Sequence, residues 1–166
     1  MLQNYCGDYL LDMDEWITYL DIKNKYQSEE IKKKCLLFIF LRLRYNEFYN
    51  LRISDNIGDK AKAIKLADDE TCQQKYNELK ENFLEKFKQI EGADTPRTWI
   101  KDIKNNEKIY YNNTHNSLKY FLTIIYIIRC NIFHGDKPPM DSNIKIIAWA
   151  YDCFDELLNA CDYWNS

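Results

Sequence analysis

One periodic stripe of apolar side chains constrains the fold of this chain more than any other feature. Apolar residues recur within the segment 69–91 at spacings of 4, 3, 4, 4 and 3: Cys72, Tyr76, Leu79, Phe83, Phe87 and Ile90. This spacing brings them to one side of an α-helix, because a helix turns once in about 3.6 residues. The segment therefore predicts an amphipathic helix that buries this stripe against other elements.

The rest of the chain also predicts helices. Its 166 residues include only 4 glycines and 3 prolines, which disfavours a turn-rich sandwich or barrel. Further helices are expected near 14–26, over about 28–51 with Ser28 as N-cap, over about 116–134, and over about 142–164. The expected buried residues of the last helix are Ile144, Ile147, Ala148, Tyr151, Phe154, Leu158 and Cys161. We predict one domain, residues 1–166, of the all-α class: a helical bundle of four main helices plus short helices.

Two stretches are predicted as loops, 53–60 and 104–114, the second because it is rich in Asn, Lys and Tyr. Between them, Thr95-Pro96 has the pattern of an N-cap followed by a first helical residue. We therefore expect a short helical turn that runs through Trp99 and Ile103.

The charge balance argues against a globally basic surface and leaves a local one open. The net charge is −3 and the sequence pI is about 5.5, which is not the signature of a nucleic-acid-binding protein. Lys and Arg nevertheless exceed Asp and Glu by three in residues 28–62 and again in residues 92–137. If these two segments face each other, a basic cleft forms on an acidic protein.

The cysteines and the apolar segments bear on the compartment. The six cysteines include no C-x-x-C pair, and several occupy apolar helical positions where a thiol acts as a small hydrophobe. Acidic residues rather than a basic start and an apolar run follow Met1, so no signal peptide is expected. The longest apolar run, 120–128, is too short to span a bilayer. We expect a cytoplasmic protein without membrane contact.

The segment 128–137 carries the residues that suggest chemistry. It ends the most apolar stretch of the chain and places Arg129, Asn131 and His134 just before Gly135. Cleavage of RNA by its own 2′-hydroxyl needs a base, an acid and a cation on the phosphate. Histidine transfers protons near neutral pH, and arginine binds phosphate without losing its charge. The pattern therefore predicts Arg129 and His134 as catalytic residues of a site that cleaves RNA.

Helix geometry limits how these two side chains can meet. Gly135 is expected to stop the helix, so His134 lies in the last turn, where the helix dipole favours the imidazolium form. Arg129 and His134 are five residues apart, which is about 140° around a regular helix. Their convergence then depends on the reach of the arginine, on distortion of the helix end, or on a second copy. A homodimer would double the site, so we expect one.

Structural roles for the same residues are an alternative. Arg129 could pair with Asp155 or Glu156 of the last helix, and His134 could cap its own helix. Cys130 and His134 are four residues apart, a spacing that can hold a metal ion from one helical face. Two further ligands are not evident nearby, so no metal site is expected.

The motif also resembles that of a known family. The run Arg-Cys-Asn-Ile-Phe-His at 129–134, followed by Gly135 and Lys137, is similar to the Arg-x-x-x-x-His signature of HEPN domains. These are small all-helical proteins, and many of them are metal-independent endoribonucleases that act as dimers in toxin–antitoxin, phage-defence and CRISPR systems. A weaker similarity covers 38–49, which resembles the early HEPN helix with its aromatic–Asn–x–x–Tyr element.

This resemblance implies that Arg129 and His134 are catalytic and that Asn131 supports them. Two positions depart from the family pattern. The residue after the arginine is often polar in the family and is Cys130 here. Asp136 stands where one branch of the family has a tyrosine that the antitoxin adenylylates, which argues against that partnership but not against the nuclease.

Further residues complete the predicted site. Asn46 and Lys137 are expected to support the catalytic pair, and Arg42, Arg44 and Lys137 are expected to bind RNA. Aromatic residues at helical spacing are often core residues, but four tyrosines could instead stack on unpaired bases: Tyr45, Tyr49, Tyr110 and Tyr111.

Two function classes follow from these features. The first is a metal-independent endoribonuclease that cleaves RNA through 2′-hydroxyl attack, as a toxin or antiviral defence effector that acts on tRNA or mRNA. The second is a non-catalytic HEPN-like module that binds RNA, a nucleotide or a protein partner. The first class predicts a homodimer and an antitoxin or regulatory protein as a partner, and it requires no cofactor.

Overall fold

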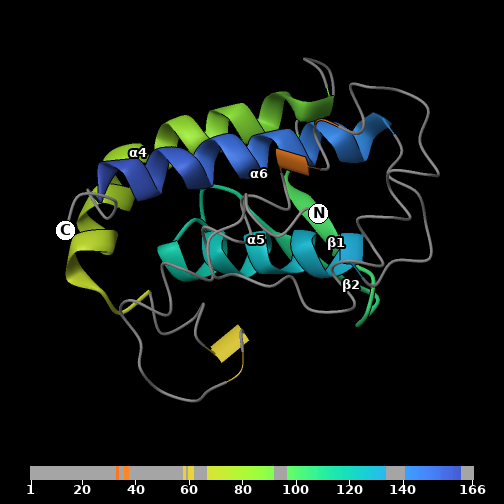
Figure 1. Ribbon diagram of the computed structural model, residues 1–166, viewed down its shortest axis with the longest axis horizontal. Helices are drawn as coiled ribbons and strands as arrows, with labels where there is room; N and C mark the ends of the chain where they lie inside the picture. The colour runs from red at the N-terminus through yellow and green to blue at the C-terminus, as the bar shows by residue number, and fades with distance from the viewer. Residues whose placement is uncertain are drawn as a thin grey trace, which may run out of the picture.

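The computed structural model describes residues 33, 36–37, 58, 60–61, 67–91, 97–133 and 141–161. The elements described over their full length are helix α4 (Glu70–Lys88), the 3₁₀ turn η1 (Gln89–Glu91), strands β1 (Trp99–Asp102) and β2 (Glu107–Tyr110), helix α5 (Leu118–Phe133) and helix α6 (Asp141–Ala160) (Figure 1). These residues thus form three helices with a two-stranded antiparallel sheet.

Helix α4 confirms the predicted amphipathic helix. The Asp69 carboxylate accepts a hydrogen bond of 2.9 Å from the backbone N–H of Cys72, which caps the first turn. Glu70 lies in that first turn, and Lys86 and Lys88 lie in the last, as the helix dipole favours. All six residues of the predicted stripe are buried in the core or packed against it.

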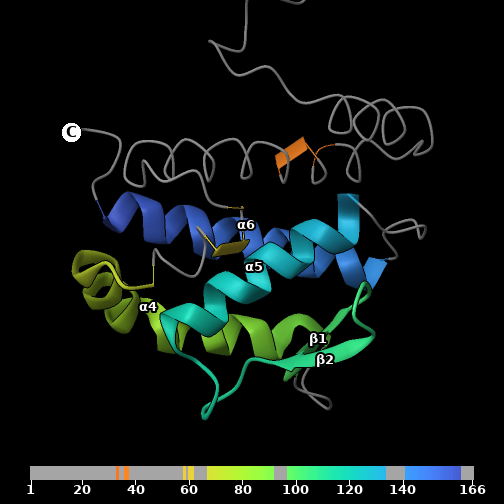
Figure 2. The same ribbon diagram turned by 90° about the horizontal axis from the view of Figure 1, so that it is seen from below.

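The three helices enclose one core. Helices α4 and α6 lie side by side, and α5 crosses over both of them (Figures 1 and 2). The hairpin of β1 and β2 lies at the carboxyl end of α5, and β1 contacts that helix. This arrangement attaches the sheet to the end of the helix that carries the arginine motif.

Helix α6 packs on both other helices, so its apolar face is wider than one stripe. Of its predicted core residues, four are buried: Ile147, Phe154, Leu158 and Cys161. Ala148 and Tyr151 are half-buried. Five further described residues are buried that the prediction omitted: Ile146, Trp149, Ala150, Cys153 and Leu157. The contact with two partner helices accounts for this second row.

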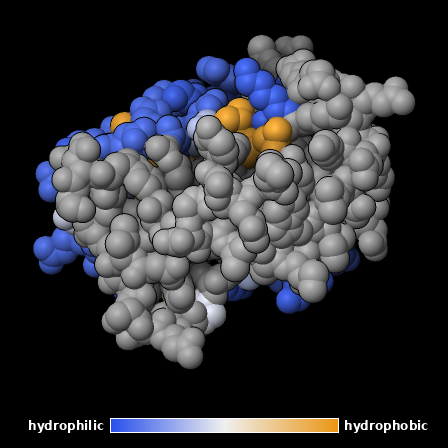
Figure 3. Space-filling model, in the orientation of Figure 1, coloured by the Kyte–Doolittle hydropathy of each residue, from blue (hydrophilic) through white to orange (hydrophobic). Residues whose placement is uncertain are grey.

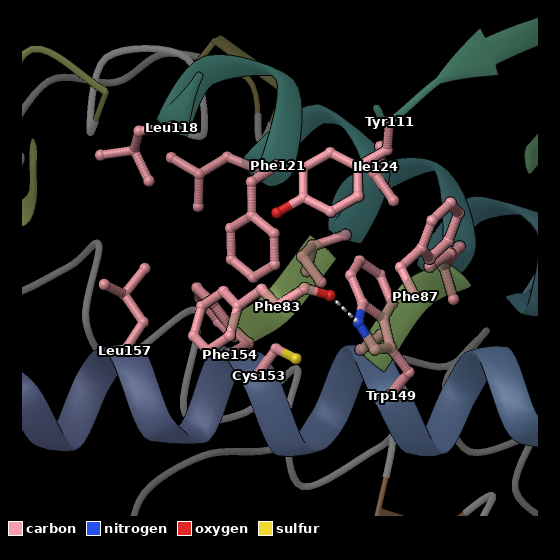
Figure 4. Packing of buried hydrophobic residues seen from close by; sticks show 14 of the residues in the cluster. Phe83, Phe87, Tyr111, Leu118, Phe121, Ile124, Trp149, Cys153, Phe154 and Leu157 are labelled. Carbon is pink, nitrogen blue, oxygen red and sulfur yellow. Dashed lines mark hydrogen bonds between the residues drawn. The ribbon is translucent and has the colours of Figure 1, made fainter. Parts of the chain in front are cut away.

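Aromatic side chains fill the core where the three helices meet (Figure 4). The ring centroids of Phe83 from α4 and Phe121 from α5 are 5.3 Å apart, and those of Phe87 and Trp149 are 4.7 Å apart. Trp149 donates its indole N–H to the carbonyl oxygen of Phe83 at 3.0 Å. The large rings therefore pack closely, and the indole has its hydrogen-bond acceptor.

Two buried tyrosines join the hairpin to α4. The hydroxyl oxygens of Tyr76, in α4, and Tyr111, just after β2, are 2.9 Å apart. Burial raises the pKa of both phenols above its ordinary value, because the interior disfavours the charged form. Tyr111 is fully buried, so of the two roles considered for it, the core role holds and stacking on RNA bases does not.

The segment 97–110 forms a β-hairpin. Its register pairs Trp99 with Tyr110, Ile100 with Ile109, Lys101 with Lys108, and Asp102 with Glu107. At the turn, the Asp102 carboxylate accepts hydrogen bonds from the backbone N–H and the side-chain amide of Asn105 at 3.2 and 2.7 Å. Asn106 takes a positive φ of 54°, a conformation that asparagine tolerates.

This sheet overturns the predicted all-α bundle of four main helices. The helical turn expected through Trp99 and Ile103 is instead strand β1 and the start of the hairpin turn, and the loop expected over 104–114 contains β2. Each strand has only four residues. The period-two pattern therefore has too few repeats to outweigh the Asn and Lys content, which is typical of loops.

Several predictions lie outside the described residues: the helix near 14–26, nearly all of the helix over 28–51, and most of the loop at 53–60. No helix within the described ranges is long and apolar enough to cross a membrane. The described surface in Figure 3 is mainly hydrophilic, with a small hydrophobic patch.

Candidate functional site at the carboxyl end of helix α5

Helix α5 positions the motif, and Ser117 precedes its first residue, Leu118. The Ser117 side-chain oxygen accepts from the backbone N–H of Tyr120 at 3.3 Å, and its carbonyl accepts from Phe121 at 3.0 Å. Seven apolar residues are buried among those of α5 whose side chains the structure describes: Leu118, Phe121, Leu122, Ile124, Ile125, Ile127 and Ile128. A helix held around most of its circumference fixes the position of its last turn.

Arg129 extends the core-facing stripe of α5 but is only half-buried. It follows Leu118, Leu122 and Ile125 at spacings of 4, 3 and 4, so all four residues share one helical face. The three apolar residues are at most 5% exposed, whereas Arg129 keeps contact with solvent. The buried stripe thus ends in a permanent positive charge near the surface.

An aromatic ring orients this arginine. The guanidinium carbon Cζ of Arg129 lies 5.6 Å from the ring centroid of Tyr126, over the ring. A cation–π contact engages the flat face of a guanidinium, while its N–H groups point outward in the plane of the fork. Such a contact orients the planar fork, which is the arginine group that binds phosphate in proteins.

Asn131 connects the motif helix to the hairpin. Its side-chain amide donates to the carbonyl oxygen of Lys101 at 2.5 Å, and its side-chain oxygen accepts from the backbone N–H of Ile103 at 3.0 Å. Both halves of the amide are thus engaged with the end of β1 and the turn. Asn131, predicted as a supporting residue, fixes the hairpin against the end of α5.

The structure brings only part of the predicted site into view. Arg129 and Asn131 are described, and five further predicted residues lie outside the described ranges: His134, Lys137, Asn46, Arg42 and Arg44. The approach of Arg129 to His134, the basic cleft and the dimer axis therefore remain predictions.

The structural alternatives for the motif involve Asp155 and Glu156 as ion-pair partners and Cys130 as a metal ligand. Glu156 forms an ion pair with Lys86 at 3.1 Å across α4 and α6, and the Asp155 carboxylate accepts from the Asn159 amide at 3.1 Å. Glu156 is thus engaged between the two helices. Cys130 is half-buried with a free thiol. Among the described residues, no group of three or more His, Cys, Asp or Glu side chains could hold a metal ion.

His115 lies in an aromatic row that the sequence analysis missed. It pairs with Asn112 in an isolated bridge after β2, and its Nδ1 lies 2.9 Å from the Thr114 hydroxyl. Its ring centroid is 6.4 Å from that of Tyr110 and 5.1 Å from that of Tyr120. The sequence pattern that could have predicted this row is a histidine flanked by tyrosines just after an Asn-Asn-Thr turn.

No protein-family model, curated protein or solved structure matches this chain. The resemblance to HEPN domains therefore rests on the motif residues alone.

Proposed function

We propose that this chain is a metal-independent endoribonuclease that cleaves RNA by attack of a 2′-hydroxyl on the neighbouring phosphate. The observation that carries the proposal is the position of Arg129, half-buried over Tyr126 at the end of an otherwise apolar stripe. A cation that is oriented before the substrate arrives stabilises developing charge on a phosphate without further reorganisation. Phosphate is the anion that the planar fork of arginine fits best, together with carboxylate.

The motif assigns one role to each residue. Arg129 donates hydrogen bonds to the non-bridging oxygens of the scissile phosphate, whose charge redistributes in the transition state. His134 transfers the proton, either from the 2′-hydroxyl or to the leaving 5′-oxygen. The reaction breaks the bond to the 5′-oxygen and yields a 2′,3′-cyclic phosphate and a 5′-hydroxyl. In a homodimer, a second copy would supply the second imidazole.

The resemblance to HEPN domains sets the biological frame of the proposal. A cytoplasmic toxin or antiviral effector that cuts tRNA or mRNA would need silencing in healthy cells, so an antitoxin or regulatory protein belongs to the proposal as a partner. A non-catalytic module that binds RNA, a nucleotide or a protein is the alternative that the experiment must separate from the nuclease.

The test is a cleavage assay on labelled single-stranded RNA in the presence of EDTA. Arg129→Ala and His134→Ala should each lower the cleavage rate at least about 100-fold, because each removes a group that acts in the transition state. Lys75→Ala, which removes one charge from the outer surface of α4, should leave the rate unchanged. Circular dichroism checks that each variant is folded.

The product and the substrate provide independent readouts. The expected product carries a 2′,3′-cyclic phosphate, and an oligonucleotide with 2′-O-methyl groups throughout should not be cut. Full activity in both motif variants, or a strict requirement for a divalent metal, would refute the nuclease mechanism. Inactivity of the wild-type chain on all RNAs, together with tight RNA binding, would favour the binding module.

A further inference from the structure

The two faces of the β-hairpin differ in composition. Cross-strand partners share a face of a sheet, and successive residues alternate between faces. Ile100 is 2% exposed and its partner Ile109 packs against the core, so their face is the inner one. The outer hairpin face is formed by the two pairs on either side of this one in the register: Trp99 with Tyr110, and Lys101 with Lys108.

The outer hairpin face is accessible. Both of its lysines are exposed, Tyr110 is 43% exposed, and Trp99 is half-buried. The Lys108 ammonium lies 4.3 Å from the centroid of the Trp99 ring, so one side of the indole already faces a cation. Two aromatic residues and two lysines thus share this face of the hairpin.

The aromatic surface continues from the sheet onto the start of α5. His115 lies between the rings of Tyr110 and Tyr120, and Tyr120 is 40% exposed. Lys119, beside it in the sequence, is also exposed. The row of rings therefore extends beyond a single stacking position, as a strand of several nucleotides would require.

The charge of this region is opposite to that of the whole chain. Residues 97–120 contain five Lys or Arg and two Asp or Glu, on a chain of net charge −3. Asp102 is buried and bonded to Asn105. Glu107 is the cross-strand partner of Asp102, so it lies off the outer hairpin face. The four residues of that face therefore present positive charge and no carboxylate.

We propose that the outer hairpin face is a binding site for single-stranded RNA. Unpaired bases stack on Trp99 and Tyr110, and the phosphates between them bind Lys101 and Lys108. A single-stranded nucleic acid offers flat π faces and regularly spaced negative charges together, and RNA is the nucleic acid on which the proposed function acts. An acidic peptide would satisfy the lysines but would leave the exposed rings without a matching partner.

The hairpin is attached directly to the motif helix. The carbonyl oxygen of Lys101 accepts the amide of Asn131, which is two residues beyond Arg129. RNA bound on the outer hairpin face would therefore lie beside the end of α5. A role of this face in guiding RNA to the nuclease site rests on the proposed function. The binding of RNA by this face does not require cleavage.

The experiment measures binding of the full chain to a fluorescent single-stranded 2′-O-methyl RNA by anisotropy. This probe cannot react through its 2′-position, so binding is read without cleavage. Tyr110→Ala and Trp99→Ala should each weaken binding roughly 5- to 150-fold, as expected for the loss of one base stack. Tyr110→Phe keeps the ring and should bind like the wild type.

The lysines are tested by the salt dependence of binding. Lys101→Gln with Lys108→Gln should make the slope of log K against log salt concentration shallower by about 1.4, because each single-strand phosphate contact contributes about 0.7. The matched control is Lys75→Gln with Lys88→Gln, which removes the same charge from α4 and should change the slope much less. If circular dichroism shows that Trp99→Ala disrupts the hairpin, Tyr110→Ala and the Lys101/Lys108 variant still decide whether the outer hairpin face binds RNA.

Three outcomes would overturn the proposal. The first is equal weakening by the two lysine pairs, which would mean general electrostatic attraction. The second is equal affinity for duplex RNA, which cannot stack on the rings. The third is binding of a polyglutamate peptide, lost in the Lys101/Lys108 variant, with no binding of RNA. Specific RNA binding by a chain that never cleaves RNA would instead reject the nuclease and leave this site standing.

Discussion

Aromatic side chains occupy two contrasting regions of this protein, the helical core and the outer hairpin face. In the core, Phe83 and Phe121 are fully buried and Trp149 is 4% exposed. On the outer hairpin face, Tyr110 is 43% exposed, and the neighbouring Trp99 lies under the ammonium group of Lys108. The residue types are similar, but their neighbours differ.

The difference shows what each set of rings can do. Core rings satisfy their polar atoms within the protein, as Trp149 does on the Phe83 carbonyl and Tyr76 does on Tyr111. Such rings are available only for packing. The rings of the outer hairpin face stand beside cations and solvent, where an external anion with a flat face can reach them. Core substitutions should therefore lower stability, whereas substitutions on the face should lower binding.

The largest effect expected on stability is that of Phe121→Ala. Its ring is fully buried among rings from α4 and α6, so its removal should lower the free energy of unfolding by about 3–5 kcal/mol. Tyr110→Ala, on the outer hairpin face, should lower it by less than about 1 kcal/mol. Urea unfolding measures both, and equal losses would show that the two regions do not differ as described.

The buried hydroxyl pair gives the next largest effect. Tyr76→Phe leaves the Tyr111 hydroxyl buried without its partner, which should cost about 1–3 kcal/mol. Tyr111→Phe should cost a similar amount. The double variant should cost less than the sum of the two, because no unmatched hydroxyl remains. An additive double variant would show that the hydrogen bond contributes nothing.

The same pair predicts a loss of stability at alkaline pH. Burial raises the pKa of both phenols in the folded state above the value of about 10 in the unfolded chain. The unfolded state therefore releases protons first, so stability is fully present below about pH 10 and falls as the pH rises further. Unfolding midpoints measured from pH 8 to 11 should fall less steeply in the double phenylalanine variant.

The spacing of apolar residues predicted the helices because each helix has several turns, so the spacing repeats several times. The stripe from Cys72 to Ile90 repeats over five turns of α4 and its 3₁₀ extension, and the predicted segment 69–91 differs from the observed 70–91 by one residue. The hairpin offers only four residues in each strand. Tyr110 and Tyr111 illustrate the consequence: they point to opposite faces, one exposed and one buried, but only a strand makes that alternation visible.

In the candidate site, positions that depend on local sequence were predictable, and contacts between residues far apart in the sequence were not. The position of Arg129 follows from one arginine in an apolar helix, and the structure places it half-buried at the end of the apolar stripe. The contact of Asn131 with Lys101 and Ile103 joins positions about thirty residues apart. No local pattern predicts such a contact, because it depends on how the hairpin docks on α5.

A substitution at Asn131 weakens the link between the hairpin and the motif helix without changing a core ring or a residue of the outer hairpin face. Asn131→Ala removes two hydrogen bonds at a partly exposed position, so it should lower the unfolding free energy by only about 1–2 kcal/mol. Amide hydrogen exchange should accelerate in β1 and β2 more than in α4. Asn131→Asp keeps the acceptor for Ile103 but loses the donor to Lys101. Its unfolding free energy should therefore lie between those of the wild type and Asn131→Ala. Uniform acceleration across both regions would show that the hairpin is not a separately attached unit.

The smallest effect is expected at the Lys86–Glu156 ion pair on the rim of the core. Its two atoms are 3.1 Å apart, and the side chains are 42% and 38% exposed. Hydrogen bonding to Glu156 raises the pKa of Lys86, but solvent screens an exposed pair, so Lys86→Gln should lower the unfolding free energy by less than about 1 kcal/mol. The loss should shrink further in about 1 M salt, where the screening length falls to about 3 Å. A loss as large as that of Phe121→Ala would mean that charge, rather than aromatic packing, joins α4 to α6.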